Sequence, residues 1–168
     1  MNYTFVSSII IVYKPLTPIL GKSFRINCIA MILRSIGTND IKVLHGVEDN
    51  KAFQLGLNNV VTAFDLMLIY ENLAKNKFAD ENLTNEMLNI LFQQKYNSRI
   101  PAKLPPEIKV AHKTGSITGV GHDSGIVFLP DGRKYVLVLL SKNVKDEKAV
   151  IEAQAEVSKI IYEYVVEK

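Results

Sequence analysis

Apolar positions at helical spacing divide the first half of the chain into three predicted helices. The first covers residues 23–36 and stops at Gly37, a residue type that commonly ends helices. The second follows Thr62, which can cap it, with Asp65 in a capping-box position. The third begins near Thr84. The apolar residues expected to be buried by these helices are Phe24, Ile26, Ile29, Met31, Ile32, Leu33, Leu66, Ile69, Tyr70, Leu73, Met87, Leu88, Leu91 and Phe92.

The second half of the chain has short strand-like runs separated by turn residues. We expect strands at residues 109–116, 122–129 and 133–141. The turn at residues 130–133 reads Pro-Asp-Gly-Arg, in which proline restricts φ and glycine permits a positive φ. The run at residues 135–140 is apolar on both faces, which predicts a central strand.

A last helix is predicted over residues 146–166. Its apolar residues recur at helical spacing and are Val150, Ala153, Val157, Ile160, Ile161 and Tyr164. Such a stripe needs a sheet to cover. Helices followed by an antiparallel meander and a covering helix predict an α+β fold. We expect one domain over residues 1–168, in which residues 1–22 have no assigned structure.

Composition and charge exclude several classes of protein. The chain is 48% hydrophobic and 22% charged, as in an ordinary globular domain. Its net charge of +3 comes from Lys and Arg residues that are interleaved with acids, so no nucleic acid partner is expected. Cys28 is the single cysteine and cannot form an internal disulfide. The three histidines lack metal-ligand spacing, and neither a metal nor a cofactor is expected.

The apolar run at residues 9–12 is the strongest hydrophobic stretch near the N-terminus. It is too short to span a bilayer, so no transmembrane segment is expected. No basic residue precedes it, as one would in a signal peptide. The run favours a buried strand or a damaged N-terminus.

The triplet Lys113-Thr114-Gly115 carries the clearest candidate chemistry. It ends an apolar run of strand character, and another strand-like run follows at once. The Lys113 ammonium offers a compact positive charge to a substrate carboxylate, and the Thr114 hydroxyl can add a hydrogen bond beside it. Gly115 has no side chain, so a ligand can approach the strand closely. The triplet therefore predicts a site for a carboxylate-bearing ligand.

The triplet and its surroundings resemble class A serine β-lactamases and related β-lactamase-like serine hydrolases. Residues 29–65 and 109–143 carry the resemblance. The motifs in the family's order are Leu33-Arg34-Ser35-Ile36-Gly37, Gly46-Val47-Glu48-Asp49, Val110-Ala111-His112-Lys113-Thr114-Gly115-Ser116, Gly125-Ile126-Val127 and Pro130-Asp131-Gly132. The resemblance implies a partial β-lactamase/transpeptidase-like fold and covers the C-terminal part of a family catalytic domain. The single domain is therefore expected to be incomplete.

The resemblance also implies roles for five residues. Lys113 supplies positive potential at the reacting centre, and Thr114 hydrogen-bonds the substrate carboxylate. Gly115 gives access, and the Ser116 backbone N–H forms half of an oxyanion hole. Glu48 lies in the long irregular stretch after Gly37, where the family places the glutamate that activates the deacylating water. Taken alone, Glu48 also fits a solvated loop carboxylate, and Lys113 fits an edge-strand lysine that discourages aggregation.

Two family motifs are missing from the sequence. No serine among the 168 residues has a lysine three positions later, so the nucleophile motif Ser-x-x-Lys is absent. The Ser-Asp-Asn motif is expected at about residues 11–15, where the chain reads Ile-Val-Tyr-Lys-Pro. Without its nucleophile, acyl-enzyme chemistry cannot proceed. We therefore expect this chain to be inactive, as the remnant of a truncated or frame-disrupted gene.

At the level of the family, the implied reaction is β-lactam amide hydrolysis through a seryl acyl-enzyme. The alternatives are a relative of the penicillin-binding D-alanyl-D-alanine peptidases, or a non-catalytic remnant with at most a binding role. The implied partner is a small-molecule β-lactam or a peptidoglycan-type substrate, and the implied location is periplasmic or otherwise extracytoplasmic.

Overall fold

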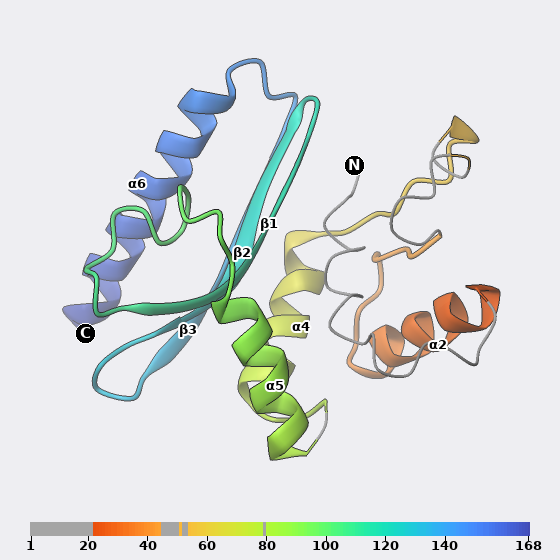
Figure 1. Ribbon diagram of the computed structural model, residues 1–168, viewed down its shortest axis with the longest axis horizontal. Coiled ribbons are helices and arrows are strands. Elements are labelled where there is room, and N and C mark those ends of the chain that lie inside the picture. The colour runs from red at the N-terminus through yellow and green to blue at the C-terminus, as the bar shows by residue number, and fades with distance from the viewer. Residues whose placement is uncertain (1–21, 45–50, 52–53, 79) are drawn as a thin grey trace.

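The computed structural model describes residues 22–44, 51, 54–78 and 80–168 (Figure 1). Within these residues it contains four helices and three strands, which confirms the predicted α+β class. The elements are α2 (Lys22–Ser35), α4 (Ala63–Ala74), α5 (Glu81–Phe92), β1 (Lys109–Ile117), β2 (Val120–Phe128), β3 (Lys134–Lys142) and α6 (Glu147–Val166). No helix in this described part is long and apolar enough to cross a membrane.

The three strands form the antiparallel meander that the sequence predicts, in the order β1-β2-β3. The β1–β2 turn is tighter than expected, because Ile117 pairs with Val120 and leaves two residues between the strands. Gly119 supplies the positive φ of +77° that this turn requires. The strand ends therefore differ from the predicted ones by one or two residues.

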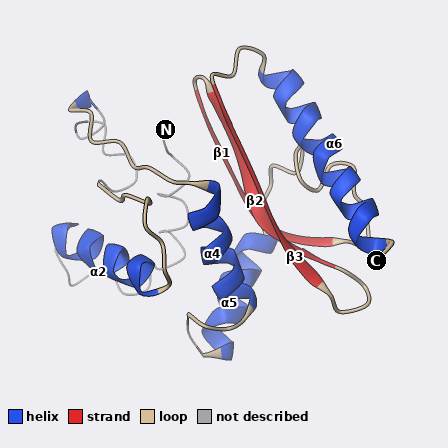
Figure 2. Ribbon diagram, turned by 180° about the vertical axis from the view of Figure 1, so that it is seen from behind, coloured by secondary structure: helices blue, strands red, loops and turns tan. Residues whose placement is uncertain are grey.

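The prediction that the apolar run at residues 135–140 is a central strand is wrong for the described sheet, where β2 is central and β3 is an outer strand. The run is apolar on both faces because helices cover both. Figure 2 shows α6 on one side of the sheet and α4 with α5 on the other. Among the described residues, the apolar character of both faces of this strand corresponds to helices that cover both faces.

The helix starts follow local capping chemistry. Thr62 caps α4 as predicted, since its hydroxyl oxygen accepts a hydrogen bond from the Asp65 backbone N–H at 3.1 Å. The predicted start of α5 near Thr84 is wrong. Asp80 is the N-cap and accepts from the Leu83 N–H at 2.9 Å, while Thr84 is buried within the helix.

Two apolar clusters hold the sheet between its helices. One joins α4 and α5 to the sheet through Tyr70, Leu73, Met87, Leu91, Ala111 and Ile126. The other joins the sheet to α6 through Ile100, Ile108, Val110, Val127, Leu129 and Leu137, with Ile161, Tyr162 and Val165 packed against it. A third cluster lies around Leu33 and Val61, and Met31, expected to be buried, is instead 69% exposed.

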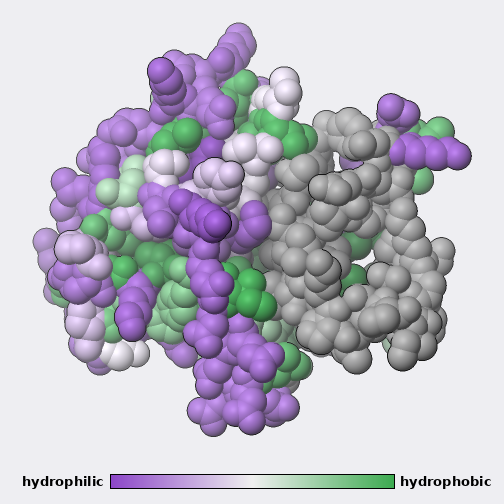
Figure 3. Space-filling view, in the orientation of Figure 1, coloured by the Kyte–Doolittle hydropathy of each residue, from purple (hydrophilic) through white to green (hydrophobic). Residues whose placement is uncertain are grey.

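The predicted stripe is only partly right for α6, since Ile161 packs against the core but other residues of the stripe do not. Gln154, Ala155 and Ser158 are the buried residues of this helix. Ser158 donates a hydrogen bond to the backbone oxygen of Ile100 at 2.8 Å, so a polar residue faces the interior. Val157, Ile160 and Tyr164 are 41%, 57% and 62% exposed. In Figure 3 the apolar side chains on the described part of the visible face lie in groups among polar ones.

Candidate active site

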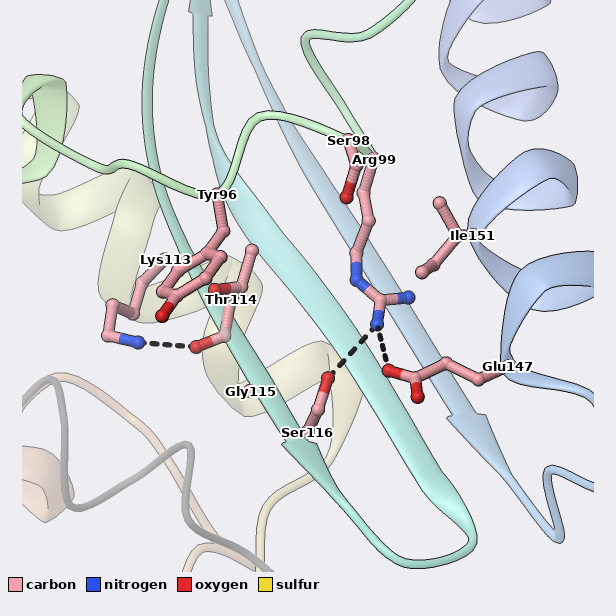
Figure 4. Close-up of a pocket in the computed structure, with 9 residues that line it drawn as sticks. All are labelled: Tyr96, Ser98, Arg99, Lys113, Thr114, Gly115, Ser116, Glu147 and Ile151. Carbon is pink, nitrogen blue, oxygen red and sulfur yellow. Dashed lines mark hydrogen bonds and ion pairs between the residues drawn. The ribbon is translucent and has the colours of Figure 1, made fainter.

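A cavity of about 470 Å³ lies between β1, the start of α6 and the segment that precedes β1. Its lining residues are Tyr96, Ser98, Arg99, Lys113, Thr114, Gly115, Ser116, Glu147 and Ile151 (Figure 4). Four of the five residues that the resemblance singled out therefore come together in one cavity. The fifth, Glu48, lies outside the described residues.

Strand β1 supplies Lys113 and Thr114 to the cavity. The Lys113 side chain is half-buried, and its Nζ donates a hydrogen bond to the backbone oxygen of Thr114. Burial lowers the pKa of the Lys113 ammonium, while the negative charge of Asp123 acts in the opposite direction. A lysine in this setting is a cation whose charge is incompletely compensated, which suits it to an anionic ligand.

Arg99 is a second cation in the cavity, and the sequence reading missed it. Its Nη1 donates to Gln154 Oε1 at 2.9 Å, and its Nη2 donates to Ser116 Oγ at 3.0 Å. The residue is only 3% exposed. Its partners come from β1 and α6, which are distant in sequence, so no local pattern indicates this position. The one available signal was a lone arginine beside the proline-rich segment that precedes β1.

Gly121 leaves room for the Arg99 guanidinium against β2. A Cβ atom at this position would lie 3.2 Å from Arg99 Nη1 and 3.4 Å from Nη2. Gln154 ties the same region together, since its Nε2 donates to the Gly121 backbone oxygen at 3.0 Å and to Ser141 Oγ at 2.9 Å. The guanidinium is thus held from three sides in one orientation.

The segment that carries Arg99 is anchored to the strands by buried polar groups. The Ile100 N–H donates to Asp123 Oδ2 at 3.0 Å, and His112 Nε2 lies 3.0 Å from Asn97 Oδ1. His112 and Asp123 lie outside the cavity lining. Among the residues with assigned positions, no group of three or more His, Cys, Asp or Glu side chains is arranged to hold a metal ion.

Several solved structures share this fold. The TLA-1 extended-spectrum beta-lactamase superposes with a TM-score of 0.74 at 24% identity, over 86% of this chain and 56% of its own. A PBP-A acyl-enzyme complex with penicillin G gives 0.74 at 22% identity, over 88% and 53%. A class A beta-lactamase from Bacteroides cellulosilyticus gives 0.74 at 20%, over 87% and 57%. The chain thus spans little more than half the length of these structures.

Sequence comparison places the chain in a family. No curated protein matches it. The profile of the beta-lactamase enzyme family, however, matches residues 17–165, nearly the whole sequence. The matched range includes the strand with the Lys-Thr-Gly triplet and every residue that lines the cavity. The chain belongs to the beta-lactamase enzyme family.

Proposed function

We propose that the cavity binds carboxylate-bearing β-lactams non-covalently, and that the 168-residue chain is not acylated by them. The main observation that supports this proposal is that the Lys-Thr-Gly strand and Arg99 line one cavity of about 470 Å³. That volume lies within the usual range for small-molecule sites. Two cations, Lys113 and Arg99, outnumber the single carboxylate of Glu147 in the lining, and this excess positive charge favours an anionic ligand over a neutral one.

Each residue has a defined part in this proposal. Lys113 attracts the ligand carboxylate, and Thr114 donates a hydrogen bond to it. Gly115 lets the bicyclic ring lie against β1, and the Ser116 backbone N–H faces the lactam carbonyl. Glu48 keeps its proposed role of positioning a water near that carbonyl.

The sequence supports the proposed absence of acylation. A seryl acyl-enzyme needs a serine that a neighbouring base activates, and no Ser-x-x-Lys occurs among the 168 residues. Ser98 and Ser116 line the cavity, but Ser116 Oγ already accepts a hydrogen bond from Arg99, which does not activate a hydroxyl. Binding without turnover is therefore the expected outcome.

The test is a titration of the ¹⁵N-labelled chain with benzylpenicillin, followed by intact-mass measurement. We expect chemical-shift changes centred on residues 113–118, a Kd of about 1 mM, no added mass, and no hydrolysis of a chromogenic cephalosporin above the buffer rate. Lys113→Ala abolishes binding. Lys109→Ala is the matched control, because Lys109 is an exposed lysine at the start of the same strand and does not line the cavity.

Two results would overturn the proposal. Shifts confined to α6, or none at millimolar ligand, would show that the cavity does not take a β-lactam. An acyl adduct in the mass spectrum, or saturable hydrolysis that Lys113→Ala removes, would show that the chain has a nucleophile after all.

A second candidate ligand is a peptide that ends in a free carboxylate, as in peptidoglycan stems. The match to PBP-A favours it, and the same two cations would hold its terminal carboxylate. Titration with an acetylated peptide ending in D-alanyl-D-alanine decides between them. Tighter binding of the peptide than of benzylpenicillin would favour the peptidase relationship.

A further inference from the structure

Glu147 places a carboxylate at the wall of the cavity, against the cation that sequence reading missed. It is the first residue of α6, and its Oε1 lies 3.6 Å from Arg99 Nη2 (Figure 4). The Glu147 side chain is 65% exposed, whereas that of Arg99 is 4% exposed. The carboxylate is therefore free to leave, and the guanidinium is not.

Arg99 cannot turn to follow a ligand. Gln154 holds Nη1, Ser116 holds Nη2, and the guanidinium lies against Gly121, so its position is determined by the strands and α6. An anion that binds Nη2 from the cavity must therefore bind the guanidinium in its present position. That side is the one on which the Glu147 carboxylate lies.

The charges that line the cavity comprise two cations, Lys113 and Arg99, and one anion, Glu147. Without Glu147 the lining would carry two uncompensated positive charges. With it, one of the two cations already has a partner. A ligand carboxylate that reaches Arg99 must displace this partner and also approach a like charge.

We propose that Glu147 is a specificity-determining residue of the cavity, whose carboxylate competes with anionic ligands for Arg99 and weakens their binding. The proposal rests on the proposed function in one respect, namely that the ligand of this cavity is an anion. It predicts that the cavity of the natural chain binds simple anions less tightly than its two cations allow.

A purely structural role for Glu147 makes a different prediction. An acidic residue in the first turn of a helix interacts favourably with the helix dipole. If that were its only role, replacing it would lower the stability of α6 and leave anion affinity unchanged or reduced. An increase in affinity on removal of the carboxylate separates the two roles.

The experiment compares Glu147→Gln with the natural chain, using two probes. Inorganic sulfate reports on the cation itself, through the Arg99 Nε–Hε resonance, and benzylpenicillin reports on the proposed ligand class. We expect Glu147→Gln to bind each probe about two- to five-fold more tightly, the range for a solvent-exposed ion pair. The difference should shrink in 0.5 M sodium chloride, because salt screens such pairs.

Glu152→Gln is the matched control. It removes the same charge from the same helix, but Glu152 pairs with Lys103 and does not line the cavity. We expect its affinity for both probes to equal that of the natural chain. A gain as large as that of Glu147→Gln would mean that overall charge, and not competition at Arg99, sets the affinity, and would overturn the proposal.

The two probes separate this inference from the proposed function. Tighter sulfate binding by Glu147→Gln supports the inference even when benzylpenicillin binds neither protein, a result that sinks the proposed function alone. Benzylpenicillin binding with equal affinity to both proteins, and equal sulfate affinities, supports the function and overturns the inference. Failure of both probes with both proteins overturns both.

Discussion

His112 and Asp123 form a buried pair across β1 and β2, with Nδ1 of the imidazole 2.8 Å from Oδ1 of the carboxylate. A carboxylate can only accept, so Nδ1 carries the hydrogen. The other carboxylate oxygen, Oδ2, accepts a hydrogen bond from the Ile100 N–H. His112 Nε2 lies within hydrogen-bond distance of the Asn97 side chain. The pair thus fixes the segment that carries Arg99, although neither residue lines the cavity.

Removing this carboxylate should destabilise the fold. Asp123→Ala leaves two buried donors, the His112 Nδ1–H and the Ile100 N–H, without their acceptor. We expect a loss of about 2–5 kcal/mol in the free energy of unfolding, measured by urea denaturation. Asp131→Ala, which removes an exposed carboxylate in the β2–β3 turn, should lower the free energy of unfolding much less. Equal losses would contradict the role of the buried pair.

Carboxylate binding by the cavity should weaken as the pH rises. Burial lowers the pKa of Lys113, so its ammonium loses its proton below the ordinary lysine value of about 10.4. Only the protonated form attracts a carboxylate, and affinity therefore falls as the pH passes through the lowered pKa. Benzylpenicillin titrations between pH 7 and pH 10 measure this fall. Lys113→Arg should flatten the profile, because a guanidinium stays charged throughout; a flat profile in the natural chain would exclude Lys113 as the titrating group.

Two glycines of β2 should respond differently to alanine. At Gly125 a Cβ atom would lie 2.3 Å from the Ala111 backbone oxygen, and backbone cannot move aside without opening the sheet. We expect Gly125→Ala to cost at least about 3 kcal/mol or to prevent folding. At Gly121 the nearest atoms belong to the Arg99 side chain, which can shift by a few tenths of an ångström.

Gly121→Ala should therefore fold and should change ligand binding more than stability. Moving the guanidinium away from β2 disturbs its contacts with Ser116 and Gln154, so sulfate affinity at Arg99 falls. Circular dichroism with urea measures the stability of both variants, and NMR titration measures the affinity of the folded one. Similar stability losses in Gly121→Ala and Gly125→Ala would contradict the expectation that a neighbouring side chain yields to a new Cβ atom more easily than neighbouring backbone does.

The exposed apolar face of α6 should promote self-association. Val157, Ile160 and Tyr164 are exposed on this helix, and burying apolar area stabilises an associated state by about 25 cal/mol per Å². We expect the natural chain to sediment faster as concentration rises, and Ile160→Lys to reduce this. Ile161→Lys places the charge at a partly buried position packed against the core and should instead lower the stability of the fold. A monodisperse monomer at all concentrations would contradict the prediction that these exposed residues of α6 promote self-association.

Sequence patterns predicted what depends on neighbouring residues. The meander, its turn at residues 130–133 and the Thr62 cap follow from local rules, since turn chemistry and capping involve residues within a few positions of each other. Lys113, Thr114, Gly115 and Ser116 line one cavity in the structure, which their adjacency did not predict, because consecutive side chains of a strand point to opposite faces of the sheet. The strand ends were off by one or two residues, within the ordinary uncertainty of such boundaries.

The sequence by itself determined the α+β order of elements and the strand that lines the cavity, both of which rest on short-range periodicity, whereas the register of the β1–β2 hairpin differs from the predicted one because the turn is tighter. Only the tertiary structure decided which face of α6 is buried and that Arg99 lines the same cavity as Lys113. Gln154 and Ser158 are buried because they hydrogen-bond Arg99 and the Ile100 backbone oxygen. These partners lie more than fifty positions earlier in the chain, so no local pattern predicts the contacts. An apolar stripe carries no information on such partners. A buried polar face therefore becomes visible only when distant segments are brought together.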